Sequence, residues 1–187
     1  MPRLFVGLEL PEPVATRLSS LRGGLSGARW IDPSDYHITL RFIGDIDRRM
    51  AHEIEDELSE IGREALEVKI AGLGVFGGDK PHTLYAAIHP SRPLLALQAE
   101  SERCLRRLGL KPEARKFTPH ITLARLKSSV SVLDVADYLA VHGAIATREG
   151  APPAAGESFM AERFALFSAR EPHGGGPYIV EAAYPLS

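Results

Sequence analysis

The sequence predicts an α+β fold made of two similar halves, and three observations support this prediction. Strand-like and helix-like patterns alternate along the 187 residues. The chain contains no Gly-rich nucleotide fingerprint and no Pro/Ser-rich linker, so a single domain over residues 1–187 is expected. The tetrapeptide His-Ile-Thr-Leu occurs twice, at residues 37–40 and 120–123. Such a repeat indicates two related lobes with no separable linker between them.

The first half alternates between the two kinds of element. Residues 3–10 are nearly all apolar and lie between two prolines, which predicts a buried strand. Apolar residues at helical spacing over 14–21 predict a helix that a glycine pair ends. After a short segment around Trp30, residues 37–42 alternate apolar and polar side chains, as a half-buried strand does. Residues 48–63 carry apolar side chains three and four positions apart and are expected to form an amphipathic helix.

The second half repeats this pattern. Residues 66–75 and 83–88 are predicted strands on either side of a Gly-Gly-Asp-Lys-Pro turn. A helix is expected between Pro93 and Gly109, since proline favours the first helical turn and glycine the residue after the last. The remaining predicted elements are a strand at 117–126, a helix at 132–141, and a closing pair of strands at 163–168 and 178–183.

The composition excludes several classes of protein. A net charge of −2, from 22 Lys and Arg against 24 Asp and Glu, argues against a protein that coats duplex nucleic acid. The single cysteine, Cys104, excludes an intrachain disulfide and a zinc site made of cysteines, which suits a cytoplasmic protein. The apolar run 4–10 is too short to span a bilayer and no cleavage site follows it, so no membrane partner is expected. The other histidines have no metal-ligand spacing, no cofactor is predicted, and a monomer is expected.

The two tetrapeptides carry the functional prediction. In a strand, alternate residues share a face, so Ile and Leu of each copy point into the core while His and Thr project from the other side. If a pseudo-twofold axis relates the halves, the catalytic candidates His37, Thr39, His120 and Thr122 face one cleft. Imidazole has an ordinary pKa near 6.5, so one histidine can act as base and the other as acid in an in-line displacement at phosphorus. The hydroxyls and nearby cations would hold the non-bridging oxygens, and no metal is required.

Each copy alone has a simpler explanation. A histidine can cap a strand end, and a threonine suits a solvated strand face. The matched pair is harder to explain in this way, because roughly one chain in 200 would contain such a repeat by accident. The pair therefore predicts a site with two imidazoles, although the residues themselves do not tell donor from acceptor.

Several segments match those of a known family. They are Arg3-Leu-Phe-Val-Gly-Leu, Tyr36-His-Ile-Thr-Leu-Arg-Phe-Ile-Gly44, Gly72-Leu-Gly-Val-Phe76, Leu84-Tyr85, Phe117-Thr-Pro-His-Ile-Thr-Leu-Ala-Arg125 and the final strand pair. With these segments the chain resembles the 2H phosphoesterase superfamily, named for two His-x-Thr-x motifs. Within it, the chain is similar to the bacterial and archaeal RNA 2′,3′-cyclic phosphodiesterases, also called 2′-5′ RNA ligase-like proteins.

The resemblance implies a bilobal, pseudo-twofold fold in which two antiparallel sheets line a central cleft, with helices outside. It also implies an RNA-processing hydrolase that converts a terminal 2′,3′-cyclic phosphate into a 2′-phosphomonoester. In this family pattern His37 is the proton donor to the departing 3′ oxygen, His120 is the base that activates water, and Thr39 and Thr122 bind the phosphate. The family often has Trp where Tyr85 stands, a difference expected to leave the chemistry untouched.

Two arginines are candidates for the cation that binds the phosphate. Arg41 lies four residues after His37 and shares its face if the strand alternates strictly. Arg125 lies five residues after His120 and points away unless a bulge changes its direction. The family resemblance favours Arg125 and the periodicity favours Arg41, so both remain substrate-binding candidates.

Three aromatic residues, Tyr36, Phe117 and Tyr178, are candidates for stacking a terminal base, although such residues more often serve packing. Several cations precede the second tetrapeptide, and they form either an electrostatic funnel for an RNA end or an ordinary solvated helix face. They are Arg103, Arg106, Arg107, Lys111, Arg115 and Lys116.

Two further functions are compatible with the sequence. One is ATP-independent 2′-5′ RNA ligation, which reverses the same two proton transfers. The other is a non-catalytic binder of nucleotides or RNA ends. Water at about 55 M outcompetes a dilute hydroxyl unless the second RNA is held in place. Pure phosphate binding is better served by arginine than by paired histidines. Hydrolysis of RNA ends that carry a 2′,3′-cyclic phosphate is therefore the predicted activity.

Overall fold

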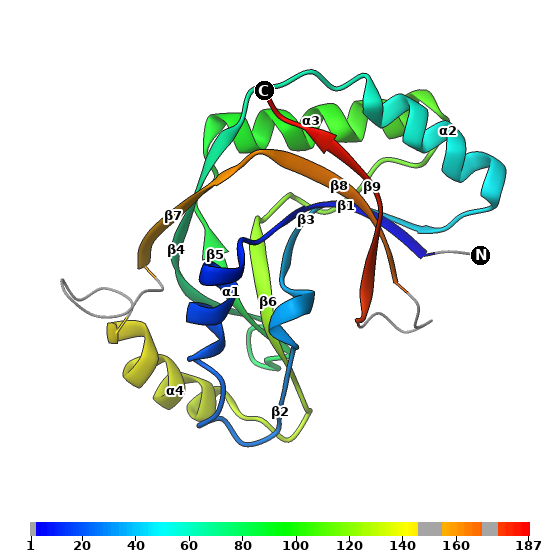
Figure 1. Cartoon of the computed structure of the whole chain (residues 1–187). Coiled ribbons are helices and arrows are strands. Elements are labelled where there is room, and N and C mark those ends of the chain that lie inside the picture. The colour runs from blue at the N-terminus through cyan, green and yellow to red at the C-terminus, as the bar shows by residue number, and fades with distance from the viewer. Residues whose placement is uncertain (1–2, 146–154, 170–175) are drawn as a thin grey trace.

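The computed structural model describes residues 3–145, 155–169 and 176–187 (Figure 1). The elements follow one another as β1 (Arg3–Glu9), α1 (Glu12–Ser19), β2 (Ala28–Trp30), the 3-10 turn η1 (Pro33–Asp35), β3 (His37–Asp45), α2 (Arg48–Ser59), β4 (Leu66–Phe76), β5 (Thr83–Ile88), α3 (Arg92–Arg107), β6 (His120–Leu126), α4 (Val132–Ile145), β7 (Ala155–Ala161), β8 (Arg163–Ala169) and β9 (Tyr178–Pro185). The predicted α+β class is confirmed, and every predicted element is present with small shifts at its ends.

Two differences from the prediction have local causes. The strand expected from residue 117 begins at His120, because Pro119 has no N–H to donate to a sheet ladder. The strand β7 was not predicted. Its sequence, Ala-Gly-Glu-Ser-Phe-Met-Ala, is rich in small residues and lacks the β-branched pattern that identifies strands.

The strands form two antiparallel groups of four that meet at one point. The order is β7-β4-β5-β6-β3-β1-β8-β9, and β2 adds to β6 outside this path. One group is β3, β1, β8 and β9, and the other is β6, β5, β4 and β7. Among the described residues they are joined only through the antiparallel pair Ile38 and Ile121, so the predicted two sheets are halves of one continuous sheet. In Figure 1 the groups splay apart on either side of this junction, as two arms of an arch.

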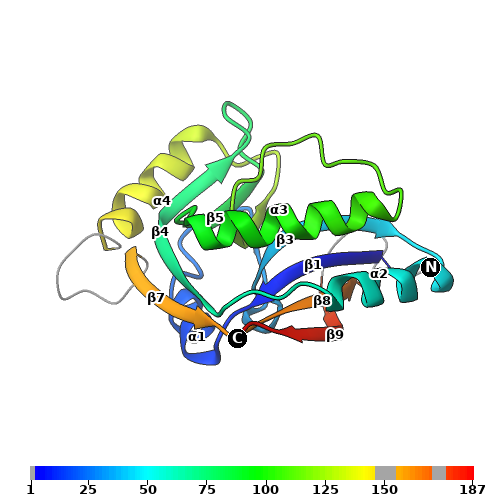
Figure 2. The ribbon, with the colours of Figure 1, turned by 90° about the horizontal axis from the view of Figure 1, so that it is seen from above.

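Helices α2 and α3 pack against each other and against the strands on one side of the arch (Figure 2). Each begins with a side chain that caps a free backbone N–H: Asp47 accepts from Met50 N in α2, and Ser91 accepts from Leu94 N in α3. A continuous core of aliphatic side chains lies beneath them and includes Ile38 and Ile121. No helix among the described residues is long and apolar enough to cross a membrane.

A bulge follows each histidine motif at the same position. Val6 pairs with Arg41 and Gly7 with Thr39, so Leu40 has no partner in β1. Likewise Leu84 pairs with Ala124 and Tyr85 with Thr122, so Leu123 has no partner in β5. An extra residue reverses the alternation of side chains beyond it. The same irregularity therefore recurs at both copies of the tetrapeptide, which supports the pseudo-twofold relation between the lobes.

Candidate active site

The junction between the two groups of strands brings the histidine motifs together. With Ile38 opposite Ile121 in an antiparallel pair, His37 lies across from Thr122, and His120 lies across from Thr39. Ile38 and Ile121 are fully buried, so the four polar residues project from the opposite face. The positive charge of His120 is one of the influences that lower the pKa of His37, which places the two rings within electrostatic range. The tertiary structure thus assembles the predicted catalytic group in one place.

Backbone carbonyls orient both imidazole rings. Nδ1 of His37 lies 2.8 Å from the carbonyl oxygen of Asp35, and Nδ1 of His120 lies 2.7 Å from that of Thr118. Because a carbonyl oxygen only accepts, each Nδ1 must carry the hydrogen. The free lone pair of each neutral ring is then on Nε2. For His37, Nε2 accepts from the Thr39 hydroxyl at 3.1 Å. Both rings therefore present Nε2 as the atom that can exchange a proton.

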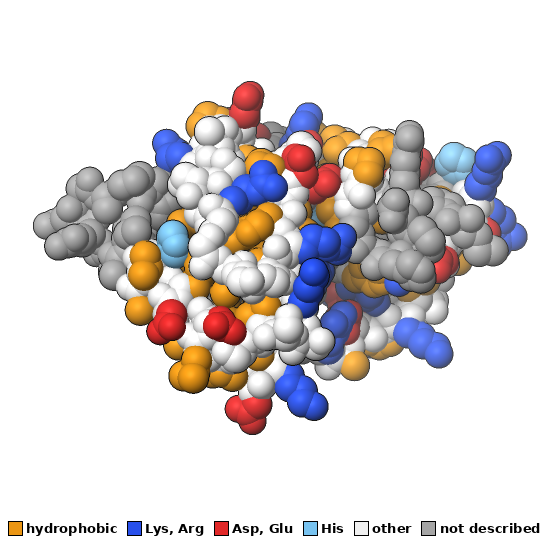
Figure 3. All heavy atoms as spheres, turned by 90° about the horizontal axis from the view of Figure 1, so that it is seen from below, with side chains coloured by type: hydrophobic (Ala, Val, Ile, Leu, Met, Phe, Trp, Pro, Cys, Tyr) orange, Lys and Arg blue, Asp and Glu red, His pale blue; other side chains and the backbone are white. Residues whose placement is uncertain are grey.

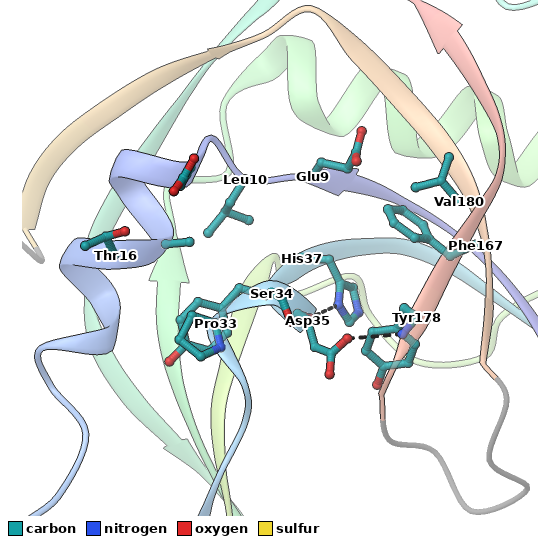
Figure 4. A pocket seen from close by; sticks show the side chains of 13 residues that line it. Glu9, Leu10, Thr16, Pro33, Ser34, Asp35, His37, Phe167, Tyr178 and Val180 are labelled. Carbon is teal, nitrogen blue, oxygen red and sulfur yellow. Dashed lines mark hydrogen bonds between the residues drawn. The ribbon is translucent and has the colours of Figure 1, made fainter.

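An aromatic wall surrounds His37. Its ring centroid is 4.7 Å from that of Phe5, 6.0 Å from that of Phe167 and 4.8 Å from that of Tyr178. Asp35 links this wall to the histidine, because its carboxylate accepts from the Tyr178 backbone N–H at 3.1 Å (Figure 4). Burial lowers the pKa of His37 to about 4, against the opposing effect of the Asp35 carbonyl. His37 is therefore neutral at pH 7 in the free protein.

A second aromatic pair flanks His120. The rings of Phe76 and Tyr85 stack 4.1 Å apart, and their centroids lie 4.9 and 5.4 Å from that of His120. Phe76 and Phe167 occupy equivalent positions, each two strands away from its histidine motif. Burial also lowers the pKa of His120, opposed by its bond to the Thr118 carbonyl. Tyr85 lies beside the site, because its cross-strand partner is Thr122, and the expectation that the difference from Trp leaves the chemistry untouched stays a prediction.

Arg125 reaches the site because of the bulge in β6. Its guanidinium NH1 donates to the Thr83 hydroxyl at 2.9 Å, and its charge helps to lower the pKa of both histidines after the larger effect of burial. Thr83 is itself buried, and its oxygen lies 2.9 Å from Nδ1 of His82. Since Arg125 can only donate to Thr83, the Thr83 hydroxyl is free to donate to His82. These two supporting residues were missed by sequence reasoning, which gives no sign of the cross-strand register.

The alternation argument for Arg41 was wrong for the same reason. The bulge at Leu40 turns Arg41 toward the interior, where it is 8% exposed. Its guanidinium donates to the Glu102 carboxylate and to the carbonyls of Phe42 and Lys111. With its three nitrogens engaged, Arg41 has little left to offer a phosphate. By count from the histidine, the residue equivalent to Arg125 is Phe42.

Two cavities of different charge adjoin the histidines. One of about 510 Å³ is lined by His37, Tyr178 and the acidic residues Glu9, Glu12 and Asp35 (Figure 4). The other, of about 760 Å³, is lined by four cations, one of them Arg41, by the two carboxylates of Glu102 and Glu113, and by polar and aromatic groups of the site. These include Thr39, Phe76, His82, Thr83, Arg115, Lys116, Phe117, His120 and Arg125. The second cavity is electrostatically better suited to a polyanion.

The aromatic stacking candidates have different positions. Tyr36 is only 5% exposed and belongs to the main core, and although it lines the smaller cavity, this burial contradicts the prediction that its ring stacks a base. Phe117 is half-buried, packs partly against that core and lines the larger cavity. Tyr178 is half-buried and lines the smaller cavity beside His37.

The cations before the second motif are partly neutralised. Arg107 pairs with Glu57 on α2, and Arg115 pairs with Glu113 at 3.2 Å. Lys116, together with Arg115, reaches the lining of the larger cavity. These cations therefore lie partly on a helix face and partly at the edge of the site, and they do not form one continuous positive surface leading to the histidines.

Comparisons with known proteins agree with this geometry. A model of the family described as LigT like phosphoesterase matches residues 8–85 and 88–178. A Bacillus subtilis (strain 168) protein named RNA 2′,3′-cyclic phosphodiesterase is 31% identical over 173 residues, 89% of this chain and 87% of the relative. An Aeropyrum pernix protein of the same name is 34% identical over 119 residues, 60% of this chain and 68% of the relative. The structure of Escherichia coli LigT complexed with 3′-AMP has a TM-score of 0.78 at 20% identity, covering 100% of this chain and 99% of that chain, which shows a shared fold.

The family match spans both histidine motifs, and the two-lobed fold agrees with it. The resemblance inferred from the sequence is thereby confirmed, as is the prediction of an enzyme. This chain belongs to the LigT-like phosphoesterase family of the 2H superfamily and is a phosphoesterase.

Proposed function

We propose that this enzyme hydrolyses the terminal 2′,3′-cyclic phosphate of RNA to a 2′-phosphomonoester by metal-independent acid-base catalysis between His37 and His120. The observation that carries the proposal is the single pair Ile38 and Ile121, which sets two His-x-Thr motifs on one face of the sheet. The names of the Bacillus and Aeropyrum relatives support the substrate.

The reaction is a displacement at phosphorus with two proton transfers. Nε2 of His120 accepts a proton from water as the water oxygen attacks phosphorus, and the bond from phosphorus to the 3′ oxygen breaks in line with it. Nε2 of His37 gives a proton to the departing 3′ oxygen, which leaves the phosphate on the 2′ oxygen. Arg125 and the hydroxyls of Thr39 and Thr122 hold the non-bridging oxygens, where negative charge builds up.

The donor role requires a proton that free His37 does not hold at pH 7. An anionic phosphate beside an imidazole raises the imidazole pKa, because it favours the charged form. Substrate binding would therefore bring a proton to Nε2 of His37, whose pKa in the free enzyme is about 4. Protonated Nε2 no longer accepts from Thr39, whose hydroxyl becomes available to the phosphate.

The decisive assay uses a short RNA that ends in a 2′,3′-cyclic phosphate, with excess EDTA present. We expect a 2′-phosphomonoester product, with turnover reduced about 10²–10⁴-fold in His37→Ala and in His120→Ala. His52→Ala, on the exposed side of α2, serves as the matched control and should keep full activity. Loss of turnover in EDTA that a divalent metal restores would overturn the mechanism. A 3′ product would overturn the direction of cleavage.

The two roles can be separated with a substrate whose 3′ bridging oxygen is replaced by sulfur. A thiolate leaves without the help of an acid, so the variant that lacks the donor should recover most of its rate on this substrate. We expect recovery for His37→Ala and none for His120→Ala. The reverse result would exchange the roles of the two histidines.

The same assay tests ligation when a second RNA with a 5′-hydroxyl is added. Without ATP, we expect the hydrolysed product to dominate, because water is present at about 55 M. A joined strand as the main product would favour the ligase alternative. We also propose that the enzyme acts as a monomer in the cytoplasm. Elution as a dimer in size-exclusion chromatography would contradict the monomeric state.

A further inference from the structure

A second arginine lies directly opposite Arg125. The short strand β2 pairs with β6 in antiparallel register, with Ala28 opposite Leu126, Arg29 opposite Arg125 and Trp30 opposite Ala124. Directly opposed residues in such a pair have Cβ atoms about 5 Å apart and side chains on the same face. Arg29 therefore lies on the face of the sheet that carries the two histidines.

Its neighbours in β2 fix this orientation. Trp30 packs against the interior, with its ring 6.0 Å from that of Tyr138 in α4, and Ala28 is half-buried in the same cluster. Arg29 is exposed between them. Burial raises the pKa of Tyr178, and the positive charges of Arg125 and Arg29 oppose that rise. Since Tyr178 touches His37, the Arg29 charge reaches the wall of the catalytic site.

The two arginines have no acidic partner in the part of the chain that the structure describes. Within the described residues, no carboxylate forms an ion pair with Arg29 or Arg125, and Arg125 has only its bond to the neutral Thr83 hydroxyl. Like charges directly opposite each other in a sheet are destabilising unless something neutralises them. The face seen in Figure 3 carries a strip of Lys and Arg side chains across its middle. A polyanionic ligand would supply the missing negative charge.

We propose that Arg29 binds the phosphodiester on the 5′ side of the terminal nucleotide, so that the enzyme prefers oligonucleotide ends to single nucleoside 2′,3′-cyclic phosphates. This inference rests on the proposed function, because it assumes that the cyclic phosphate lies between the histidines. Arg29 would thus determine substrate class, while Arg125 holds the reacting phosphate.

The different roles proposed for Arg29 and Arg125 follow from the position of each guanidinium. Arg125 is held by Thr83 and acts on both imidazoles, so it belongs to the reacting phosphate. Arg29 lies one strand farther out, in β2, on the side of β6 away from Thr83. An RNA end carries a second charge only one nucleotide from the reacting group. A pair of opposed arginines matches two successive phosphates, which a mononucleoside substrate cannot offer.

Three substrates test the proposal: a nucleoside 2′,3′-cyclic phosphate, the same compound with a 5′-phosphate, and a dinucleotide with the same cyclic end. We expect the 5′-phosphate and the dinucleotide linkage each to lower KM about tenfold in the unmodified enzyme, with kcat unchanged. Raising the salt concentration should weaken this advantage, since one more phosphate contact steepens the salt dependence.

Arg29→Ala should abolish the advantage while leaving the KM and kcat of the unphosphorylated compound unchanged. Arg29→Lys keeps the charge and should retain most of the discrimination, which separates charge from any effect on β2. The matched control is Arg106→Ala, which removes one charge from the last turn of α3. It should leave all three substrates unaffected.

Two results would overturn the proposal. If Arg29→Ala impairs the three substrates equally, Arg29 acts on the reacting phosphate or on the fold. If the unmodified enzyme shows no preference for the second phosphate, the proposed subsite does not exist. Failure of the unmodified enzyme to hydrolyse any of the three would instead reject the proposed function itself.

Discussion

The neutral state of His37 gives a quantitative test of the site. Burial among aromatic rings lowers its pKa to about 4, whereas an unperturbed histidine in the unfolded chain has a pKa near 6.5. Between about pH 4 and pH 6.5, the His37 imidazole is protonated in the unfolded chain but neutral in the folded protein. The free energy of unfolding therefore falls as the pH drops through this window. From pH 7 to pH 4.5 the loss from this one group amounts to about 2 kcal/mol.

The perturbation is His37→Gln, which keeps a polar side chain and removes the titration. Urea unfolding of both proteins between pH 4.5 and 7 gives the free energy of unfolding at each pH. We expect the unmodified protein to lose about 2 kcal/mol more than the variant over this range. His120 titrates in both proteins, so the difference isolates His37. His52→Gln, on the exposed side of α2, is the matched control for the substitution itself.

The reasoning fails if the two stability curves run parallel. It also fails if the NMR signal of the His37 ring titrates near pH 6.5 in the folded protein, because that would mean that the aromatic wall does not exclude water from the charged form.

Three other predictions follow from the contacts of the site. Arg41→Ala should lower the free energy of unfolding by about 3 kcal/mol, measured in urea, because it leaves the Glu102 carboxylate without its partner. The KM of this variant should stay within twofold of that of the unmodified enzyme, whereas Arg125→Ala should raise KM at least tenfold. The opposite pattern would mean that Arg41, and not Arg125, binds the phosphate. Thr83→Val should raise KM severalfold, because it removes the hydroxyl that accepts from the Arg125 guanidinium, and Thr83→Ser should restore the activity. Equal losses of activity in both variants would mean that Thr83 serves only packing. The pH profile of kcat/KM should be bell-shaped with its maximum below pH 6.5, because burial lowers the pKa of both imidazoles, and a maximum at pH 8 would contradict this.

The sequence was a good guide to the elements and to the His and Thr pairs that the structure brings together. Periodicity located the strands and helices, because each buries a regular stripe of apolar side chains. The repeated tetrapeptide located the residues of the candidate site, because an alternating strand must turn His and Thr to the same side. Two strands were missed: β2, which has only three residues, and β7, a sequence of small residues whose pairing depends on β4.

The predictions from the sequence were weakest for the residues that flank the two His-Ile-Thr-Leu motifs or pair with them across strands. A bulge cannot be read from His-Ile-Thr-Leu, and it decides whether Arg41 or Arg125 faces the site. From the sequence, Tyr36 was a candidate for stacking a base because it is next to His37. In the structure it lies in the core, because η1 ends immediately before it. Thr83 gave no signal at all, since its role depends on its register with β6.

The sequence by itself determined the two lobes, the pair of histidines and their hydroxyl neighbours, because these depend on local pattern and on a repeat within one chain. The tertiary structure alone decided which cations meet the histidines, how far each imidazole is desolvated, and that Arg29 stands beside Arg125. The physical reason is that pKa values and phosphate binding depend on distances across strands. Pairing of segments far apart in the chain sets these distances, and no local pattern specifies that register.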